Sequence, residues 1–145
     1  MKDEHGMWKY LRPKLAPHGM FTRIETGGTA SGVPDVDAFL EDYGPLKIEL
    51  KICKDVNNGF TLRPAQHRFM QDRIKLGDRR LWILAAIDDR SISVQPRWLL
   101  IHGSSSRQLI EDKSVSNWMK HAWYDHHGFL DNESIERLIS EMQVV

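Results

Sequence analysis

The sequence of 145 residues is poor in cysteine and contains no long apolar run. Its single cysteine, Cys53, cannot form an internal disulfide or a four-cysteine zinc site, which agrees with a reducing compartment. The longest apolar run is far shorter than the roughly 20 residues that a membrane span needs, and the acidic start MKDEHG lacks the pattern of a signal peptide. We therefore expect a soluble, cytoplasmic protein without a membrane partner.

The chain also lacks net charge, because 20 basic residues balance 20 acidic ones. The net charge therefore does not indicate a nucleic-acid partner. The charges are unevenly distributed, however. Residues 1–102 hold 16 of the basic and 13 of the acidic residues, whereas residues 103–145 hold 4 and 7. If some acids in the first part bind a metal, that part presents a more basic surface than its formal charge indicates.

No internal repeat, low-complexity segment or linker divides the sequence, so we expect one domain over residues 1–145, with a core at about 4–102 and a helical tail of three short pieces at about 104–145. Periodicity and turn residues predict an α/β fold with a mixed central sheet flanked by helices. The expected core elements are a helix at 3–15 interrupted near Pro13, strands at 19–26, 35–41 and 46–54, a helix at 64–77, a buried central strand at 79–87, and one or two further strands at 91–95 and 97–103.

The segment KIELKICK, residues 47–54, alternates charged and apolar residues with the period of a β-strand. One face of this strand is expected to be core and the other ionic, with the ionic side chains outside the core. The apolar face carries Ile48, Leu50 and Ile52, and the ionic face carries Lys47, Glu49 and Lys51.

Two acids precede this strand. One of them, Asp35, is expected to lie within a rung or two, that is, one or two cross-strand pairs, of Glu49 and Lys51. The EDYGP turn marks a hairpin in which the numbers of paired residues sum to about 84–88. Two carboxylates at such a distance repel each other unless a divalent cation holds their oxygens, and Lys51 could then orient a water or stabilise charge on a phosphate. A charged strand face that only contacts water has the same pattern, so these residues alone leave both interpretations open.

Several segments in this order resemble the PD-(D/E)XK nuclease superfamily. Pro34-Asp35 matches the PD element, and ELK at 49–51 matches the (D/E)XK element. The segments RIETGGTASGVPDVDAF, KIELKICK and LRPAQHRFM are together similar to the small phage-type VRR-Nuc and Holliday-junction-resolvase-like branch. The resemblance covers about residues 4–87, leaves the tail unexplained, and implies a restriction-endonuclease-like core.

The resemblance also implies roles for individual residues. Asp35 and Glu49 would bind Mg²⁺ or Mn²⁺, with the backbone carbonyl of Leu50 as a further ligand. Lys51 would position the attacking water and stabilise the charge that develops on the phosphate. Gln66, in the first turn of its helix, would contact that water or the scissile phosphate, and a hydrogen bond at the helix end is its alternative role.

The extra acid that many members of the superfamily carry would be Glu4 or Glu25, and the sequence does not choose between them. A favourable charge at a helix N-terminus is the alternative role for Glu4. Four basic residues flank the proposed site and are candidates for phosphate contacts, with solvated surface charges as the alternative. They are Arg23, Lys47, Lys54 and Arg63.

A second cluster, DHHG at 125–128, invites comparison with the DHH phosphoesterases, but the acidic motifs that such a site needs on preceding strands are missing. A zinc site from His121, Asp125 and His126 fits helical spacing, although clustered histidines at helix ends more often cap helices or lie on the surface.

The sequence therefore predicts a Mg²⁺-dependent DNA endonuclease, a hydrolase that cuts phosphodiester bonds, with selectivity for branched DNA such as Holliday junctions and flaps. Its alternative is a non-catalytic DNA-binding module that keeps the nuclease fold. A homodimer is expected by analogy with enzymes that make two cuts in one junction.

Overall fold

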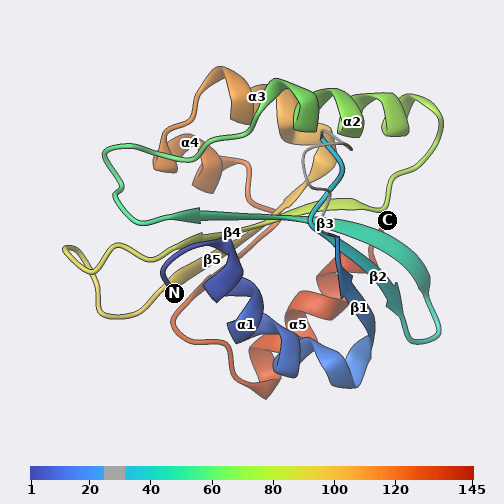
Figure 1. Cartoon of the computed structure of the whole chain (residues 1–145), viewed down its shortest axis with the longest axis horizontal. Coiled ribbons are helices and arrows are strands. Elements are labelled where there is room, and N and C mark those ends of the chain that lie inside the picture. The colour runs from blue at the N-terminus through green and yellow to red at the C-terminus, as the bar shows by residue number, and fades with distance from the viewer. Residues whose placement is uncertain (25–31) are drawn as a thin grey trace.

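A computed structural model describes residues 1–24 and 32–145. In this part of the chain, six strands form one mixed sheet in the order β1-β2-β3-β4-β5-β6 (Figure 1). The strands are β1 (Gly19–Arg23), β2 (Val36–Leu40), β3 (Gly44–Cys53), β4 (Leu81–Ile87), β5 (Arg97–His102) and β6 (Tyr124–His127). The prediction of an α/β fold with a mixed sheet is confirmed.

Helices cover both faces of the sheet. Helices α1 (Glu4–Leu15) and α5 (Asn132–Met142) lie on one face, and α2 (Pro64–Lys75), α3 (Ser106–Glu111) and α4 (Val115–Lys120) lie on the other (Figure 1). Two short 3₁₀ helices, at Ala16–His18 and Gly103–Ser105, complete the elements. In the described residues, no helix is both long and apolar enough to cross a membrane.

The sheet takes its mixed character from β3 and β4, which are parallel, while the other neighbouring strands are antiparallel. Parallel strands cannot be joined by a tight turn, so the chain crosses over the sheet between them through α2. All seven residues of β4 are buried, as expected for a central strand that has helices on both faces.

The hydrophobic core has two parts, one on each face. The first packs α1 and α5 against the sheet and includes Ile48 and Leu50 of β3. The second packs α2, α3 and α4 against the opposite face and includes Met70 of α2 and Trp118 of α4. Burial of apolar surface on both faces fixes the helices that surround β3.

The first helix is not interrupted near Pro13, contrary to the prediction. Helix α1 continues to Leu15, and the Ala16 amide still donates to the Arg12 carbonyl. Proline removes one helical hydrogen bond, but here it lies in the last turn, where few bonds remain to be lost. Leu11 and Leu15 are almost fully buried, and their packing holds the last turn in place.

Of the one or two strands predicted at 91–95 and 97–103, the second is present as β5, and the segment at 91–95 is not a strand. Asp89 accepts hydrogen bonds from the Ser91 amide and hydroxyl and from the Val56 amide, and these bonds fix a turn. Ile92 and Val94 remain 62% and 75% exposed, so no burial favours an extended strand there. Alternation of apolar residues therefore did not distinguish a strand from an exposed loop.

The predicted helical tail contains three helices, α3, α4 and α5, but it also contains a strand that was not predicted. Residues 124–127 form β6, which pairs with β5 at the edge of the sheet. Residues 104–145 are therefore part of the packed fold, and the tail is no separate appendage. Four residues give too short a pattern for periodicity to reveal a strand, and pairing with β5 supplies what the local sequence lacks.

Candidate active site

The β2–β3 hairpin brings the two predicted carboxylates together. Val36 pairs with Ile48, so the next position along each strand places Asp35 beside Glu49. Because β2 begins at Val36, the Leu50 amide has no strand partner there, and it donates to Asp35 Oδ2 at 2.9 Å instead. This bond fixes the Asp35 carboxylate against β3.

Glu49 is buried on the α2 face of the sheet, with 1% of its surface exposed. Burial, together with repulsion from Asp35, raises the pKa of Glu49 to about 9, although the charge of Lys51 opposes this shift. Of its two carboxylate oxygens, Oε2 is buried and has no hydrogen-bond partner among the described residues. In the absence of a cation, Glu49 therefore keeps a proton at neutral pH.

Both Glu49 and Lys51 are buried, which corrects the expectation that the ionic face of β3 lies outside the core. Lys51 is only 8% exposed. The reason is the crossover to β4, because α2 packs over this face and covers it. Nearer the start of the strand on the same side, Lys47 stays partly exposed and Pro45 is exposed.

Gln66 links the two buried charges. Its Nε2 donates to Glu49 Oε1 at 2.7 Å, and its Oε1 accepts from Lys51 Nζ at 2.9 Å. Lys51 Nζ also lies 3.7 Å from Glu49 Oε1. Gln66 itself is 3% exposed, so the three side chains form a polar network in the interior of the protein.

The first turn of α2 determines where Gln66 points. Pro64 occupies the first helical position, where its missing N–H costs nothing, and Arg63 precedes it in an extended conformation. The Arg63 amide donates to Gln66 Oε1 at 2.9 Å. The alternative role of Gln66 at the helix end is therefore confirmed, and the same side chain also reaches Glu49 and Lys51. Its contact with a water or a phosphate stays a prediction.

No described contact connects a candidate for the predicted extra acid with the carboxylates of this cluster. Glu4 lies in the first turn of α1, which packs on the opposite face of the sheet, and no hydrogen bond or ion pair of its carboxylate with Asp35 or Glu49 occurs among the described residues. Glu25 lies outside the described residues.

The four basic residues that were predicted to contact phosphates have different partners in the structure. Lys47 pairs with Asp37 at 3.0 Å, and Lys54 pairs with the buried carboxylate of Asp88 at 2.8 Å. The Arg23 guanidinium donates to the Glu4 carbonyl at 3.5 Å. Arg63 is exposed beside the site, and its charge is one of those that act on Glu49.

The donor set is compatible with a divalent cation that binds oxygen. Asp35 and Glu49 supply carboxylates, and the unpartnered Glu49 Oε2 is a buried acceptor without a donor. In residues 1–24 and 32–145, no group of three or more His, Cys, Asp and Glu side chains gathers, so the side chains offer two ligands and not a complete shell. Mg²⁺ commonly binds through one or two carboxylates and keeps several waters, so two carboxylates suit it.

The histidine cluster of the tail does not form a zinc site. Asp125 forms a two-pronged ion pair with Arg97, His126 Nε2 contacts the Phe129 carbonyl, and His121 Nδ1 contacts the Asn117 carbonyl. Each of the three predicted ligands is thus engaged with a different partner.

A scan against protein-family models finds no match, and a search of curated proteins finds no similar sequence. The function is therefore inferred from the geometry of this site.

Proposed function

We propose that the protein is a metal-dependent DNA endonuclease of the PD-(D/E)XK type, with a restriction-endonuclease-like core. The observation that carries this proposal is the buried Glu49 carboxylate, which lies beside Asp35 and has one oxygen without a partner in the part of the chain that the structure describes. Without a cation this arrangement is costly, because Glu49 must either hold a proton far above its ordinary pKa or repel Asp35, and an unpaired buried acceptor is costly as well. Both problems disappear when a divalent cation binds.

The cation of this proposal is Mg²⁺ or Mn²⁺, held by Asp35, Glu49 and the Leu50 carbonyl. When bound, the cation lowers the pKa of a nucleophilic water and polarises a phosphate oxygen.

Lys51 contributes a positive charge from the protein itself to the proposed site. An ammonium group has three donors, and the Gln66 side chain takes one of them at 2.9 Å. This bond, together with the nearby Glu49, holds Lys51 Nζ beside the carboxylates. The remaining donors can contact a water and stabilise the negative charge that grows on the phosphate in the transition state.

Gln66 acts as a positioning residue in this proposal. Its amide binds two partners at once, since its nitrogen donates to Glu49 and its oxygen accepts from Lys51. Because Gln66 belongs to the first turn of α2, the position of the helix sets the distance between the two charged groups. We place branched DNA, such as junctions and flaps, as the substrate, and a homodimer as the active form.

The test is cleavage of a supercoiled plasmid and of synthetic junction, flap and duplex DNA, with Mg²⁺, with Mn²⁺ and with EDTA. Cleavage is expected only with the metals, and faster on the branched substrates. Equal cleavage in EDTA would contradict a metal-dependent mechanism. Size-exclusion chromatography with light scattering tests the dimer.

A second candidate is a DNA-binding module that keeps the fold but has no activity. The observation that favours it is the closed network of Glu49, Lys51 and Gln66, which by itself ties α2 to the sheet. DNA binding without cleavage of any of these substrates, in either metal, would support this candidate.

A further inference from the structure

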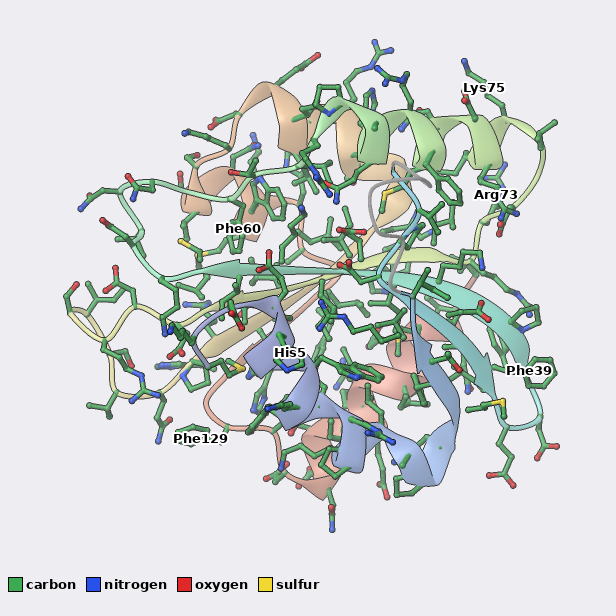
Figure 2. The ribbon with its side chains drawn as sticks, in the orientation of Figure 1. His5, Phe39, Phe60, Arg73, Lys75 and Phe129 are labelled. Carbon is green, nitrogen blue, oxygen red and sulfur yellow. The ribbon has the colours of Figure 1, made fainter. Side chains whose placement is uncertain are left out.

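A hollow of about 620 Å³ lies at the end of α2 away from Gln66. Its lining comes from four places: the β2–β3 hairpin, the last turn of α2, the loop that leads into β4, and residue Val145. Figure 2 shows Arg73 at the C-terminal end of α2, on the side of the view where the hairpin carries Phe39. The hollow is thus built by segments that the fold brings together around one end of α2.

The hollow is basic, although the whole chain is neutral. Four basic side chains and two acidic ones line it, a net charge of +2 for the side chains. The C-terminal end of a helix carries partial negative charge, which works against an anion, but the basic side chains here outweigh it. The basic members are Lys47, Arg73, Arg79 and Arg80, and the acidic members are Asp37 and Asp78.

The basic side chains differ in how they are held. The Arg80 guanidinium stacks on the Tyr43 ring at 3.9 Å and donates to the Tyr43 carbonyl at 2.9 Å, so it is already in place. Arg73 and Lys47 form partly exposed ion pairs with Asp78 and Asp37. Arg79 is exposed, and its guanidinium forms no hydrogen bond or ion pair within the described part of the chain.

The hollow is adjacent to the candidate active site. Lys47 is two residues before Glu49 on β3, and alternation along the strand puts both side chains on the same face. Two residues of a strand span about 7 Å. Asp35, beside Glu49, is partly exposed and lies two residues before Asp37, which lines the hollow, so a phosphodiester strand at Asp35 can continue into the hollow.

An exposed aromatic side chain lies beside the hollow. Phe39 is 57% exposed and pairs in register with Pro45, which lines the hollow. Asp37, two residues earlier on the same strand, also lines it, so Phe39 faces the same side of the sheet. Met20, opposite Phe39 on β1, is 74% exposed. The two side chains form an apolar platform next to a basic hollow.

We propose that the hollow and this platform bind an unpaired DNA strand next to the cleavage site, an inference that rests on the proposed nuclease function and names its substrate class. The basic side chains contact consecutive phosphates, and a base of the same strand stacks on Phe39. Basic grooves combined with exposed aromatic side chains suit single strands, because a base inside a duplex has no free face for stacking. Substrates with an unpaired segment next to the cut are then favoured over uninterrupted duplexes.

The experiment measures fluorescence anisotropy of a labelled single-stranded oligonucleotide and of the same sequence as a blunt duplex, in EDTA, over a range of salt concentrations. The variants are Phe39→Ala and Arg79→Glu, with Arg79→Gln as a milder change. The matched control is Arg12→Glu, which reverses an exposed arginine on α1, across the sheet from the hollow. Circular dichroism verifies that each variant is folded.

Phe39→Ala is expected to weaken binding of the single strand roughly 5- to 150-fold and to leave duplex binding unchanged. Arg79→Glu is expected to weaken binding and to reduce the salt slope by about 0.7 for each phosphate that the variant no longer neutralises. Arg12→Glu is expected to bind like wild type. Equal effects of Phe39→Ala on both DNA forms, or an unchanged salt slope in Arg79→Glu, would overturn the proposal.

A small substrate separates this proposal from the proposed nuclease function. Hydrolysis of a nitrophenyl phosphodiester of thymidine needs the active site but not a distant strand contact. Phe39→Ala and Arg79→Glu are expected to hydrolyse it like wild type. If wild type hydrolyses neither this diester nor DNA, the nuclease function fails, while the anisotropy measurements still decide whether the hollow binds an unpaired strand.

Discussion

Two buried carboxylates on neighbouring parallel strands have opposite electrostatic states. Glu49 lies in β3 and Asp88 directly follows β4, and neither side chain is more than about 2% exposed. Burial and the neighbouring Asp35 raise the pKa of Glu49 to about 9. Burial also acts to raise the pKa of Asp88, but hydrogen bonds from Lys54 and Arg90 outweigh it and lower that pKa to about 2.

The difference lies in the partners and not in the depth of burial. Asp88 is surrounded by cations that the chain supplies, so its charge is neutralised within the folded protein. Glu49 has another carboxylate beside it, one partly compensating lysine and an oxygen without a donor. A buried acid that the protein neutralises is structural, whereas one that it leaves unneutralised is suited to a cation from solution.

The largest expected effect is on cleavage. Glu49→Gln is expected to abolish cleavage and to remove Mn²⁺ binding measured by calorimetry, because an amide is a much poorer ligand than a carboxylate for a hard cation. Asp88→Asn is expected to cut DNA like wild type, and to lose about 1–2 kcal/mol of stability, since its charge-assisted bonds from Lys54, Arg90 and the Met1 ammonium become weaker. Loss of cleavage in Asp88→Asn and not in Glu49→Gln would reverse the assignment of the two acids.

Lys51→Met is expected to reduce cleavage about 10²- to 10³-fold while Mn²⁺ still binds, because it removes a charge that stabilises the transition state and leaves both carboxylates in place. Methionine keeps most of the aliphatic stem, so packing under α2 is retained. Unchanged cleavage rates at saturating metal would exclude a catalytic role for this lysine.

Lys51→Met is also expected to lower the stability of the fold, because Lys51 is buried and does not lie on a solvated face. Gln66 Oε1 and Glu49 lose a donor and a charge, and a loss of about 1–3 kcal/mol is expected in urea denaturation. Gln71→Ala is the control. Gln71 lies on the same helix as Gln66, but it hydrogen-bonds to Ser106, outside the charged network.

The two acids are expected to respond to pH in opposite directions when metal is removed. The pKa of Glu49 is higher in the folded state than its ordinary value of 4.5, so the folded protein holds a proton that the unfolded chain releases. Stability therefore falls as the pH rises from about 4.5 toward about 9, by up to about 1.4 kcal/mol per pH unit. Asp88 instead stabilises the fold above its ordinary pKa of 3.8, and that contribution is lost as the pH falls toward 2.

Thermal melting in EDTA between pH 2 and pH 9 measures both effects. Glu49→Gln is expected to remove the loss of stability above pH 5, and Asp88→Asn to flatten the acid side of the curve. Added Mn²⁺ is expected to stabilise wild type most at high pH, where the metal competes least with protons. A metal-free wild-type protein that is more stable at pH 9 than at pH 5 would contradict the raised pKa of Glu49.

The smallest expected effect concerns the flanking basic residues. Arg63→Ala is expected to weaken DNA binding uniformly across sequences and to lower the salt slope by about 1, because its side chain is exposed beside the site. Lys54→Ala is expected to lower stability more than affinity, since Lys54 is already paired with Asp88. Anisotropy titrations at several salt concentrations, alongside melting temperatures, compare the two variants.

The sequence by itself placed Asp35 within a rung or two of Glu49. Alternation in residues 46–54 and the turn residues of EDYGP are local signals, and in a hairpin they limit the register to a few positions. The observed pairing of Val36 with Ile48 lies within the predicted range. The buried central strand and the start of the second helix at Pro64 were also predictable, because a long apolar run and a first-turn proline act within a few residues.

Only the tertiary structure decided that Glu49 and Lys51 are buried. Strand alternation distinguishes the two faces of β3, but it cannot show that the crossover to β4 lays α2 over the charged face and brings Gln66 between Glu49 and Lys51. The same holds for β6, whose four residues become a strand through pairing with β5. The raised pKa of Glu49 has this origin, because burial and the approach of Asp35 depend on contacts between segments that the chain brings together only when it folds.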